Sequence, residues 1–279
     1  KMYEVKSQMY SDPRTGEILS ASIFIPVGYD PGFSYKAYTL AADPRVREQY
    51  LPVEIYGEQI RNDVARAMGK CLGFAENQLA SSAYPVDSLR SPSFTREYGL
   101  SPSIMDRVPA NYIARPGDME RGVALVQHGI GGYDYFLVKW LYRPVPGAVT
   151  PREETAVLDR WVAESRSNPY FRFGRFVWGM HRPVNDPRMQ AFDLGDDPVK
   201  AFRYRLDNIK YIMENYGSLT WEDDKEMTAR VNFRNVLTNA VSAELNRMLS
   251  HVGGVYINEV HADEDIRAYT VVPREQHRA

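Results

Sequence analysis

Residues 57–73 constrain the fold of this chain more than any other segment. Their apolar members recur at every fourth position: Ile60, Val64, Met68 and Leu72. Polar residues fall on the opposite side: Asn62, Arg66 and Lys70. This period predicts an amphipathic helix over residues 57–72. Gly73 is expected to end the helix, because glycine readily adopts the left-handed conformation that closes one.

The rest of the chain predicts an α+β fold. Residues 16–25 follow a turn-forming segment, end at a proline and predict a strand. No period runs through residues 80–109, which predicts a long irregular segment. Helices are expected at three places: 152–165, 198–216 and 223–251. A short strand is expected at 255–257.

Two parts are expected, divided in the turn-rich region between residues 103 and 116. Residues 1–110 would hold a twisted mixed sheet and the helix described above, and residues 111–279 would be mainly helical. With 279 residues, of which 44% are hydrophobic, the chain is long enough to bury a substantial core. We see no internal repeat.

Charge and cysteine content exclude several classes of protein. The 34 basic and 36 acidic residues are interspersed and leave a formal net charge of -2, which argues against nucleic acid as a partner and favours proteins or small molecules. Cys71 is the single cysteine, so an internal disulfide is excluded. No apolar run is long enough to predict a transmembrane segment. The chain opens abruptly at Lys1, so we expect a fragment or a processed product, with any export signal upstream.

The end of the first helix carries a motif frame. Residues 66–77 read Arg-Ala-Met-Gly-Lys-Cys-Leu-Gly-Phe-Ala-Glu-Asn. This segment resembles the zinc motif of metzincin peptidases, His-Glu-x-x-His-x-x-Gly-x-x-His. The frame is kept at four positions: Gly69, Leu72, Gly73 and Asn77. The positions of the zinc ligands and of the base have changed. Arg66 and Lys70 replace the helix histidines, Ala67 replaces the glutamate base and Glu76 replaces the third histidine.

Segments in the flanks strengthen the resemblance. Residues 103–106 read Ser-Ile-Met-Asp and resemble the methionine turn of metzincins, with Met105 as its methionine, although Arg107 stands where a tyrosine is usual. Further segments are similar, in order, to large secreted bacterial metzincin-like proteins: 12–19, 111–118, 186–188, 193–201, 253–256 and 271–273. The resemblance implies a zincin-like fold in the first part of the chain.

The substitutions remove the chemistry that the resemblance implies. Arg66 has no lone pair to offer a metal, and Lys70 could ligate zinc only if it were neutral. Glu76 is one carboxylate without partners, and Ala67 leaves no general base. We therefore expect that zinc has been lost and that the chain is a catalytically inactive pseudopeptidase.

The five histidines could supply an alternative zinc site: His128, His181, His251, His261 and His277. None has a second histidine four residues away. His181 near Asp186, and His261 near Asp263 and Asp265, are the histidines with carboxylates close in sequence. We favour surface or structural roles for all five.

The replacing charges suggest a second hypothesis. The turn after the helix should bring Glu76 back toward Arg66 and Lys70, so an ion-pair cluster could stand in the place of the metal. The alternative is that Asn62, Arg66 and Lys70 form a solvated helix face. The two interpretations are balanced on the sequence alone.

Two further patterns have plain explanations. Asp193, Asp196 and Asp197 could gather around calcium, but a helix cap at Asp197-Pro198 is the favoured interpretation. Aromatic residues in two stretches, 133–142 and 161–173, could line a peptide or carbohydrate groove, although core packing is favoured.

The expected function follows from the resemblance. It implies a binding or structural module of the bacterial cell envelope, located in the periplasm or at the outer membrane, with a protein or peptide as partner. A peptide could add to an edge strand carrying Ile18, Ser20, Ser22 and Phe24 without being cut. An active zinc peptidase with relocated ligands and a glycan-binding or envelope-assembly subunit are the alternatives.

Overall fold

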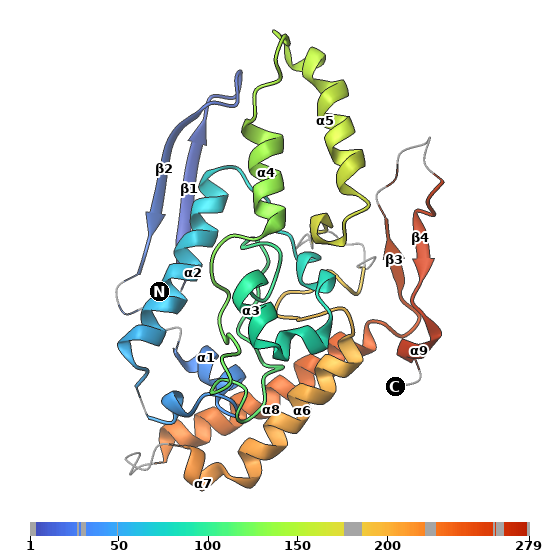
Figure 1. The fold of residues 1–279 in the computed structure, drawn as a ribbon. Coiled ribbons are helices and arrows are strands. Elements are labelled where there is room, and N and C mark those ends of the chain that lie inside the picture. The colour runs from blue at the N-terminus through green and yellow to red at the C-terminus, as the bar shows by residue number, and fades with distance from the viewer. Residues whose placement is uncertain are drawn as a thin grey trace.

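The computed structural model describes residues 4–26, 28, 32–48, 50–175, 186–220, 227–258, 260 and 265–277. One β-hairpin lies along a long helix, α2, and a second hairpin lies on the opposite flank (Figure 1). Two helices, α4 and α5, project at one end of the molecule, and α6, α7 and α8 lie at the other. Among these residues the fold is mixed α and β with small sheets, as expected.

Both sheets are antiparallel hairpins. The first pairs β1 (Lys6–Ser11) with β2 (Ile18–Phe24), and the second pairs β3 (Val255–Ile257) with β4 (Tyr269–Val271). The predicted mixed sheet is therefore wrong for the described residues. A mixed sheet needs parallel neighbours joined by a crossover, whereas β1 and β2 are joined by a short turn.

The turn between β1 and β2 is built by its own sequence. The side chain of Asp12 accepts a hydrogen bond from the Arg14 backbone N–H at 2.8 Å, and the Gly16 N–H donates to the Asp12 carbonyl at 2.8 Å. Gly16 has a φ of 76°, which glycine adopts without steric cost. The turn thus sets the register in which Met9 faces Ala21.

The predicted first helix is α2 (Val53–Cys71), which begins four residues before Gly57 because Pro52 precedes it in an extended conformation. The helix ends at Cys71, one residue before the predicted end at Leu72. Gly73 has a φ of 81°, and the Phe74 N–H donates to the Gly69 carbonyl at 3.0 Å. The apolar stripe is not uniformly buried, however, since Met68 keeps 50% of its surface exposed.

The segment 80–109 is more ordered than its aperiodic sequence predicts. It holds two 3₁₀ helices, η2 (Ala80–Ala83) and η3 (Val86–Arg90), and the short helix α3 (Pro92–Tyr98). Ser91 caps α3 by accepting a hydrogen bond from the Phe94 N–H at 3.3 Å. These pieces are too short to show a helical period in sequence.

The remaining elements follow in order: α1 (Gly32–Thr39), η1 (Pro44–Val46), α4 (Gly132–Tyr142), α5 (Pro151–Ser165), η4 (Pro169–Phe171), α6 (Pro198–Glu214), α7 (Tyr216–Leu219), α8 (Thr228–Leu249) and α9 (Arg274–His277). The three predicted C-terminal helices are α5, α6 with α7, and α8. The strand at 255–257 is β3. Asp197 caps α6 by accepting hydrogen bonds from the N–H groups of Val199 and Lys200, so the favoured cap interpretation is confirmed.

The largest buried cluster joins α1, α6 and α8 through Tyr35, Ile209, Ile212, Phe233 and Leu237. It also includes Val123 and Leu125 from the central loops. Residues from both sides of the expected division at 110 thus share one core. The division into two parts stays a prediction.

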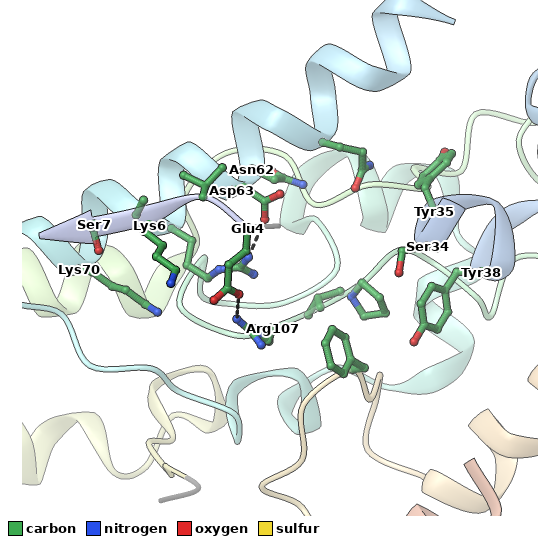
Figure 2. A pocket seen from close by; sticks show the side chains of 17 residues that line it. Glu4, Lys6, Ser7, Ser34, Tyr35, Tyr38, Asn62, Asp63, Lys70 and Arg107 are labelled. Carbon is green, nitrogen blue, oxygen red and sulfur yellow. Dashed lines mark hydrogen bonds and ion pairs between the residues drawn. The ribbon is translucent and has the colours of Figure 1, made fainter. Parts of the chain in front are cut away.

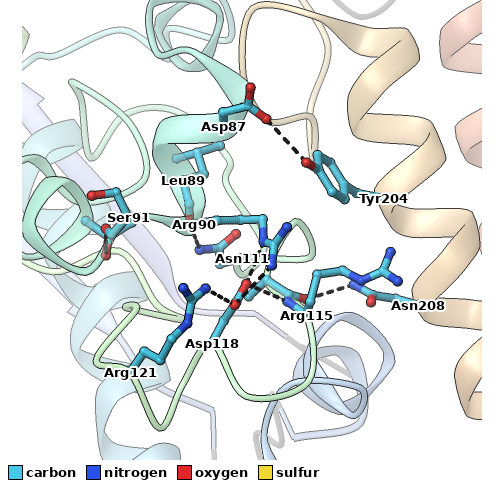
Figure 3. A network of polar contacts seen from close by, with 12 residues as sticks. Asp87, Leu89, Arg90, Ser91, Asn111, Arg115, Asp118, Arg121, Tyr204 and Asn208 are labelled. Carbon is cyan, nitrogen blue, oxygen red and sulfur yellow. Dashed lines mark hydrogen bonds and ion pairs between the residues drawn. The ribbon is translucent and has the colours of Figure 1, made fainter.

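A polar network holds the turn at residues 111–118 against this core (Figure 3). Asp118 is 1% exposed and binds the guanidinium groups of Arg90, at 2.7 Å, and Arg121. Asn208 of α6 donates to the carbonyls of Tyr112 and Ala114 at 2.9 and 2.8 Å. Buried polar groups that are hydrogen-bonded in this way favour one arrangement of a loop over its alternatives.

Candidate functional site

The altered motif positions lie on one face of α2. Arg66 binds Asp63 through Nη2 and Oδ1 at 2.6 Å, and Lys70 binds Glu76 through Nζ and Oε1 at 2.6 Å. Ala67 lies between the two cations and is 4% exposed. The expected cluster is therefore present for Lys70 and Glu76 but not for Arg66, whose bonded carboxylate is Asp63. The i, i+3 spacing of Asp63 and Arg66 was a signal for this pair that the sequence interpretation missed.

Glu76 is held from two sides. Lys70 donates to one of its oxygens, and Gln78 Nε2 donates to the other at 3.2 Å. Burial alone would raise the pKa of Glu76, but the hydrogen bond and charge of Lys70, with the charges of Arg107 and Arg66, lower the pKa below its usual value. Glu76 therefore keeps its negative charge at neutral pH.

The turn after α2 is held by hydrogen bonds of Asn77, which is completely buried. Its side chain donates to the Arg172 carbonyl at 2.8 Å and accepts from the Gly174 N–H at 3.0 Å. Its own N–H donates to the Met105 carbonyl at 3.2 Å. Asn77 therefore connects the end of the motif frame to the loop that carries Met105.

Met105 is completely buried beneath α2. A Cβ atom built on Gly69 would lie 2.5 Å from the Met105 sulfur, so the helix approaches the methionine as closely as it does because residue 69 is glycine. Asp134 holds this loop by accepting hydrogen bonds from Ser103 Oγ at 2.7 Å and from the Ile104 N–H at 2.9 Å. The sequence interpretation missed Asp134.

A cavity of about 470 Å³ opens over this face of α2 (Figure 2). The helix contributes Asn62, Asp63, Arg66, Ala67 and Lys70 to its lining. Residues 4–7, which lead into β1, form a second wall, residues 107–109 with Phe192 a third, and α1 a fourth. Arg66 and Lys70, two of the four altered positions, thus contribute charged side chains to the surface of a cleft.

The strand beside this cleft is β1. Lys6 and Ser7 line the cavity, whereas Ile18, Ser20, Ser22 and Phe24 of β2 do not. The predicted strand is present as β2, which pairs with β1. The sequence indicated a strand without indicating which of the two strands of the hairpin would line the cavity.

Arg107 closes one end of the cavity. Its Nη2 lies 3.3 Å from a carboxylate oxygen of Glu4, and its guanidinium lies over the Phe192 ring at 5.9 Å. The Phe192 N–H donates to the Arg107 carbonyl at 3.0 Å. The residue after the methionine loop is therefore a cation directed at the cleft, at the position where the resemblance led us to expect tyrosine.

Two carboxyl groups lie close together near Arg107: Asp106, which is buried, and Asp193, which is partly buried. The Ser81 N–H donates to Asp106 Oδ2 at 2.6 Å, and Ser81 Oγ lies 3.5 Å from Asp193 Oδ1. Burial raises the pKa of Asp106 to about 7, and burial together with the charge of Asp106 raises the pKa of Asp193. Both carboxyl groups therefore keep their protons to a higher pH than an exposed aspartate does.

Comparison with known proteins gives one result that bears on this site. A sequence model of the Met-zincin family matches residues 48–279. The chain belongs to the Met-zincin family. No curated protein and no solved structure matches the chain.

Zinc is the metal of metzincin sites, and the residues at the motif positions of this Met-zincin do not fit it. Arg66 and Lys70 are cations, each paired with one carboxylate, Asp63 and Glu76 respectively, and neither cation offers a lone pair to a metal. The described part of the chain contains no group of three or more His, Cys, Asp or Glu side chains placed to hold a metal. Loss of the metal stays a prediction.

The histidines occupy separate places. His128 Nε2 bonds the Arg96 carbonyl at 2.9 Å, and His251 Nδ1 bonds the Arg247 carbonyl at 3.1 Å. Burial lowers the pKa of His251. His181 and His261, with Asp263, lie outside the described residues, as does the side chain of His277.

The three aspartates considered for calcium have different partners. Asp193 lies against Ser81, Asp196 accepts from the Val86 N–H at 3.1 Å, and Asp197 caps α6. One oxygen of each aspartate is engaged with a group of the protein itself. In the part of the chain that the structure describes, no helix has the length and apolar character required to cross a bilayer.

A second cavity of about 540 Å³ is lined by aromatic side chains. They come from α4, η4 and the segment that follows η4: Tyr133, Phe136, Trp140, Phe171 and Phe173. The aromatic residues of the second half thus line a groove as well as packing together. Trp161 packs instead under the Lys139 ammonium, 4.7 Å from the ring centre.

Proposed function

We propose that this Met-zincin binds an extended peptide in the cleft between β1 and α2 and does not cleave it. The observation that carries the proposal is the cavity itself, in which a strand and the altered motif face lie opposite each other. A peptide could pair with the edge of β1, so that main-chain hydrogen bonds supply affinity and the helix face supplies selectivity. The edge proposed is β1, because β1 and not β2 borders the cavity.

The chemistry of the face supports binding without hydrolysis. Peptide hydrolysis by this motif needs an activated water and a base, and Ala67 offers a methyl group at the position of the base. The guanidinium of Arg66 offers no lone pair to a metal, and its positive charge repels a metal cation. We propose that Met105 serves as the methionine turn, supporting the helix from below.

The location and partner follow from the family resemblance. We propose a role as a binding or structural module of the bacterial cell envelope, in the periplasm or at the outer membrane, with a protein segment as the partner. A protein that presents an extended segment at its surface would meet the requirements of the cleft.

Zinc content is the first test. The protein purified without added metal should hold less than about 0.1 zinc per chain by elemental analysis, and it should not cleave an unfolded protein substrate. Near-stoichiometric zinc with peptidase activity would establish the relocated-ligand alternative and overturn the proposal.

A restored variant provides the matched control. Arg66→His, Ala67→Glu, Lys70→His and Glu76→His together should bind about one zinc per chain, because Lys70 and Glu76 already meet at 2.6 Å. If the restored variant also remains free of zinc while it folds normally, the alignment with the motif frame is wrong.

The aromatic groove supports the glycan-binding alternative. Rings such as Trp140 and Phe173 line a cavity of the size that ligands occupy. Soluble glycan fragments from the bacterial envelope should not change the intrinsic tryptophan fluorescence if the cleft between β1 and α2 is the binding site. Saturable quenching by a glycan, with no peptide binding, would favour this alternative.

A further inference from the structure

The cleft between β1 and α2, called the β1 cleft below, is lined by more cations than carboxylates. The lining contains four cations, Lys6, Arg66, Lys70 and Arg107, and two carboxylates, Glu4 and Asp63. Glu76, which lies behind Lys70, is a third carboxylate. Each of these carboxylates is bound to a different cation: Glu4 to Arg107, Asp63 to Arg66 and Glu76 to Lys70. Lys6 is the cation that remains.

Lys6 has no ion pair with any residue that the structure describes, and it is exposed at the mouth of the cavity. In Figure 2 the side chains of Lys6 and Lys70 extend in the same direction, one from the strand and one from the helix. Arg107 lies beyond them, below Glu4. A ligand entering between strand and helix therefore meets cations on both walls.

The paired cations still have free donors. A lysine ammonium has three N–H groups and an arginine guanidinium has five. Lys70 makes one hydrogen bond to Glu76, and the contact of Arg107 with Glu4 is 3.3 Å long. Both can accept a further oxygen without losing their present partner. Each carboxylate already has a cation beside it, so the net charge that the cavity presents to a ligand is positive.

We propose that the peptide bound in this cleft carries an acidic side chain, and that Lys6, Lys70 and Arg107 bind its carboxylate. This inference rests on the proposed peptide binding and adds the chemical class of the ligand. Glutamate or aspartate satisfies the unpaired Lys6 and uses the free donors of the other two cations. A lysine or arginine at the same place would leave Lys6 unpaired and add a like charge.

The probe is a set of three fluorescein-labelled pools of capped heptapeptides. The central residue is Glu, Gln or Lys, and the other positions are mixtures of Val, Thr, Ser and Tyr, which favour extended backbone. Binding is measured by fluorescence anisotropy in 20 mM and 500 mM salt. We expect the Glu pool to bind about threefold to tenfold more tightly than the Gln pool at low salt, and the difference to shrink at high salt.

Two variants assign the preference to the cleft. Lys6→Glu should abolish or reverse the preference for the Glu pool. Lys210→Glu changes the net charge equally on an exposed position of α6, away from the cavity, and should leave the preference intact. A preference that survives in Lys6→Glu, or that disappears equally in both variants, contradicts the assignment.

The two proposals fail in different ways. Equal binding of the Glu and Gln pools overturns the acidic preference and leaves peptide binding standing. Absence of binding by all three pools at millimolar concentration overturns peptide binding itself. Tighter binding of the Lys pool shows that the carboxylates, and not the cations, recognise the ligand.

Discussion

At the scale of single residues, the positions compared with the zinc motif form ion pairs: Lys70 with Glu76, and Arg66 with Asp63. Lys70 and Glu76 are about one-third exposed, at 38% and 29% of their side-chain surface, so water screens part of their attraction. Their contact nevertheless connects the helix to the segment beyond Gly73. Arg66 does not share in it, because Asp63 lies one helical turn away and is closer in sequence.

A double-mutant cycle measures this connection. Lys70→Met and Glu76→Gln should show a coupling of about 0.5–1 kcal/mol in the free energy of unfolding by urea. The matched cycle with Arg66→Met and Glu76→Gln should show a smaller coupling, because Arg66 acts on Glu76 through its charge without an ion-pair contact. Equal couplings in both cycles would mean that Arg66 and Lys70 share Glu76, as the sequence alone allowed.

At the scale of elements, the close approach of α2 to the Met105 loop organises the site. The approach depends on Gly69, since any side chain there meets the Met105 sulfur. The loop is held from the other side by Asp134, which also accepts a hydrogen bond from the Gly131 N–H at 2.8 Å at the start of α4. One carboxylate thus fixes both a helix start and the support beneath the motif face.

Alanine substitution at two glycines of α2 tests this packing. Gly69→Ala should destabilise the protein by about 1–3 kcal/mol, because the methionine beneath is buried and must move. Gly57→Ala on the same helix should stabilise it by about 0.5–1 kcal/mol, since a Cβ there meets nothing within 4 Å and alanine favours helix. Thermal melting of the two variants gives the comparison, and stabilisation by Gly69→Ala contradicts the packing described.

At the scale of the whole molecule, the carboxyl pair connects segments far apart in sequence. Asp106 follows the methionine loop, and Asp193 precedes the cap of α6. Ser81 contacts both, and Asp106 Oδ1 has no hydrogen-bond partner among the described residues. Ionising both groups in this interior is unfavourable, because burial and mutual repulsion act together.

The stability of the protein should therefore depend on pH through this pair. The folded-state pKa of Asp106 is raised to about 7, above its value of about 4 in an unfolded chain. Between these two values the folded state binds more protons than the unfolded state, so the stability contributed by this group falls as pH rises from about 4 to 7.

Asp106→Asn should remove this dependence. The difference in unfolding free energy between Asp106→Asn and the unmodified protein should increase, in favour of the variant, from pH 4.5 to pH 8, on the order of a few kcal/mol. Asp159→Asn, at an exposed position of α5, is the control and should show a constant difference. A constant difference for Asp106→Asn as well would show that Asp106 is ionised in the folded protein throughout this range.

Part of this fold could be predicted from the sequence alone, because it depends on interactions between residues that are close together in the chain. The period of residues 57–72 indicated a helix, Gly73 its end, and Asp197-Pro198 the start of α6, because periodicity and capping act within a few residues along the chain. The metzincin resemblance of residues 66–77 and of Met105 pointed to the family that the chain belongs to. Loss of the metal and the peptide edge remain predictions.

Long-range packing settled what the residues left open. The partner of Arg66, the choice of β1 over β2 as the wall of the cleft, and the meeting of Asp106 with Asp193 all depend on contacts between distant segments. Such contacts depend on how the apolar faces of distant segments pack against one another. They produce no periodic pattern in the sequence from which they could be predicted. The same packing places the unpaired Lys6 opposite Lys70.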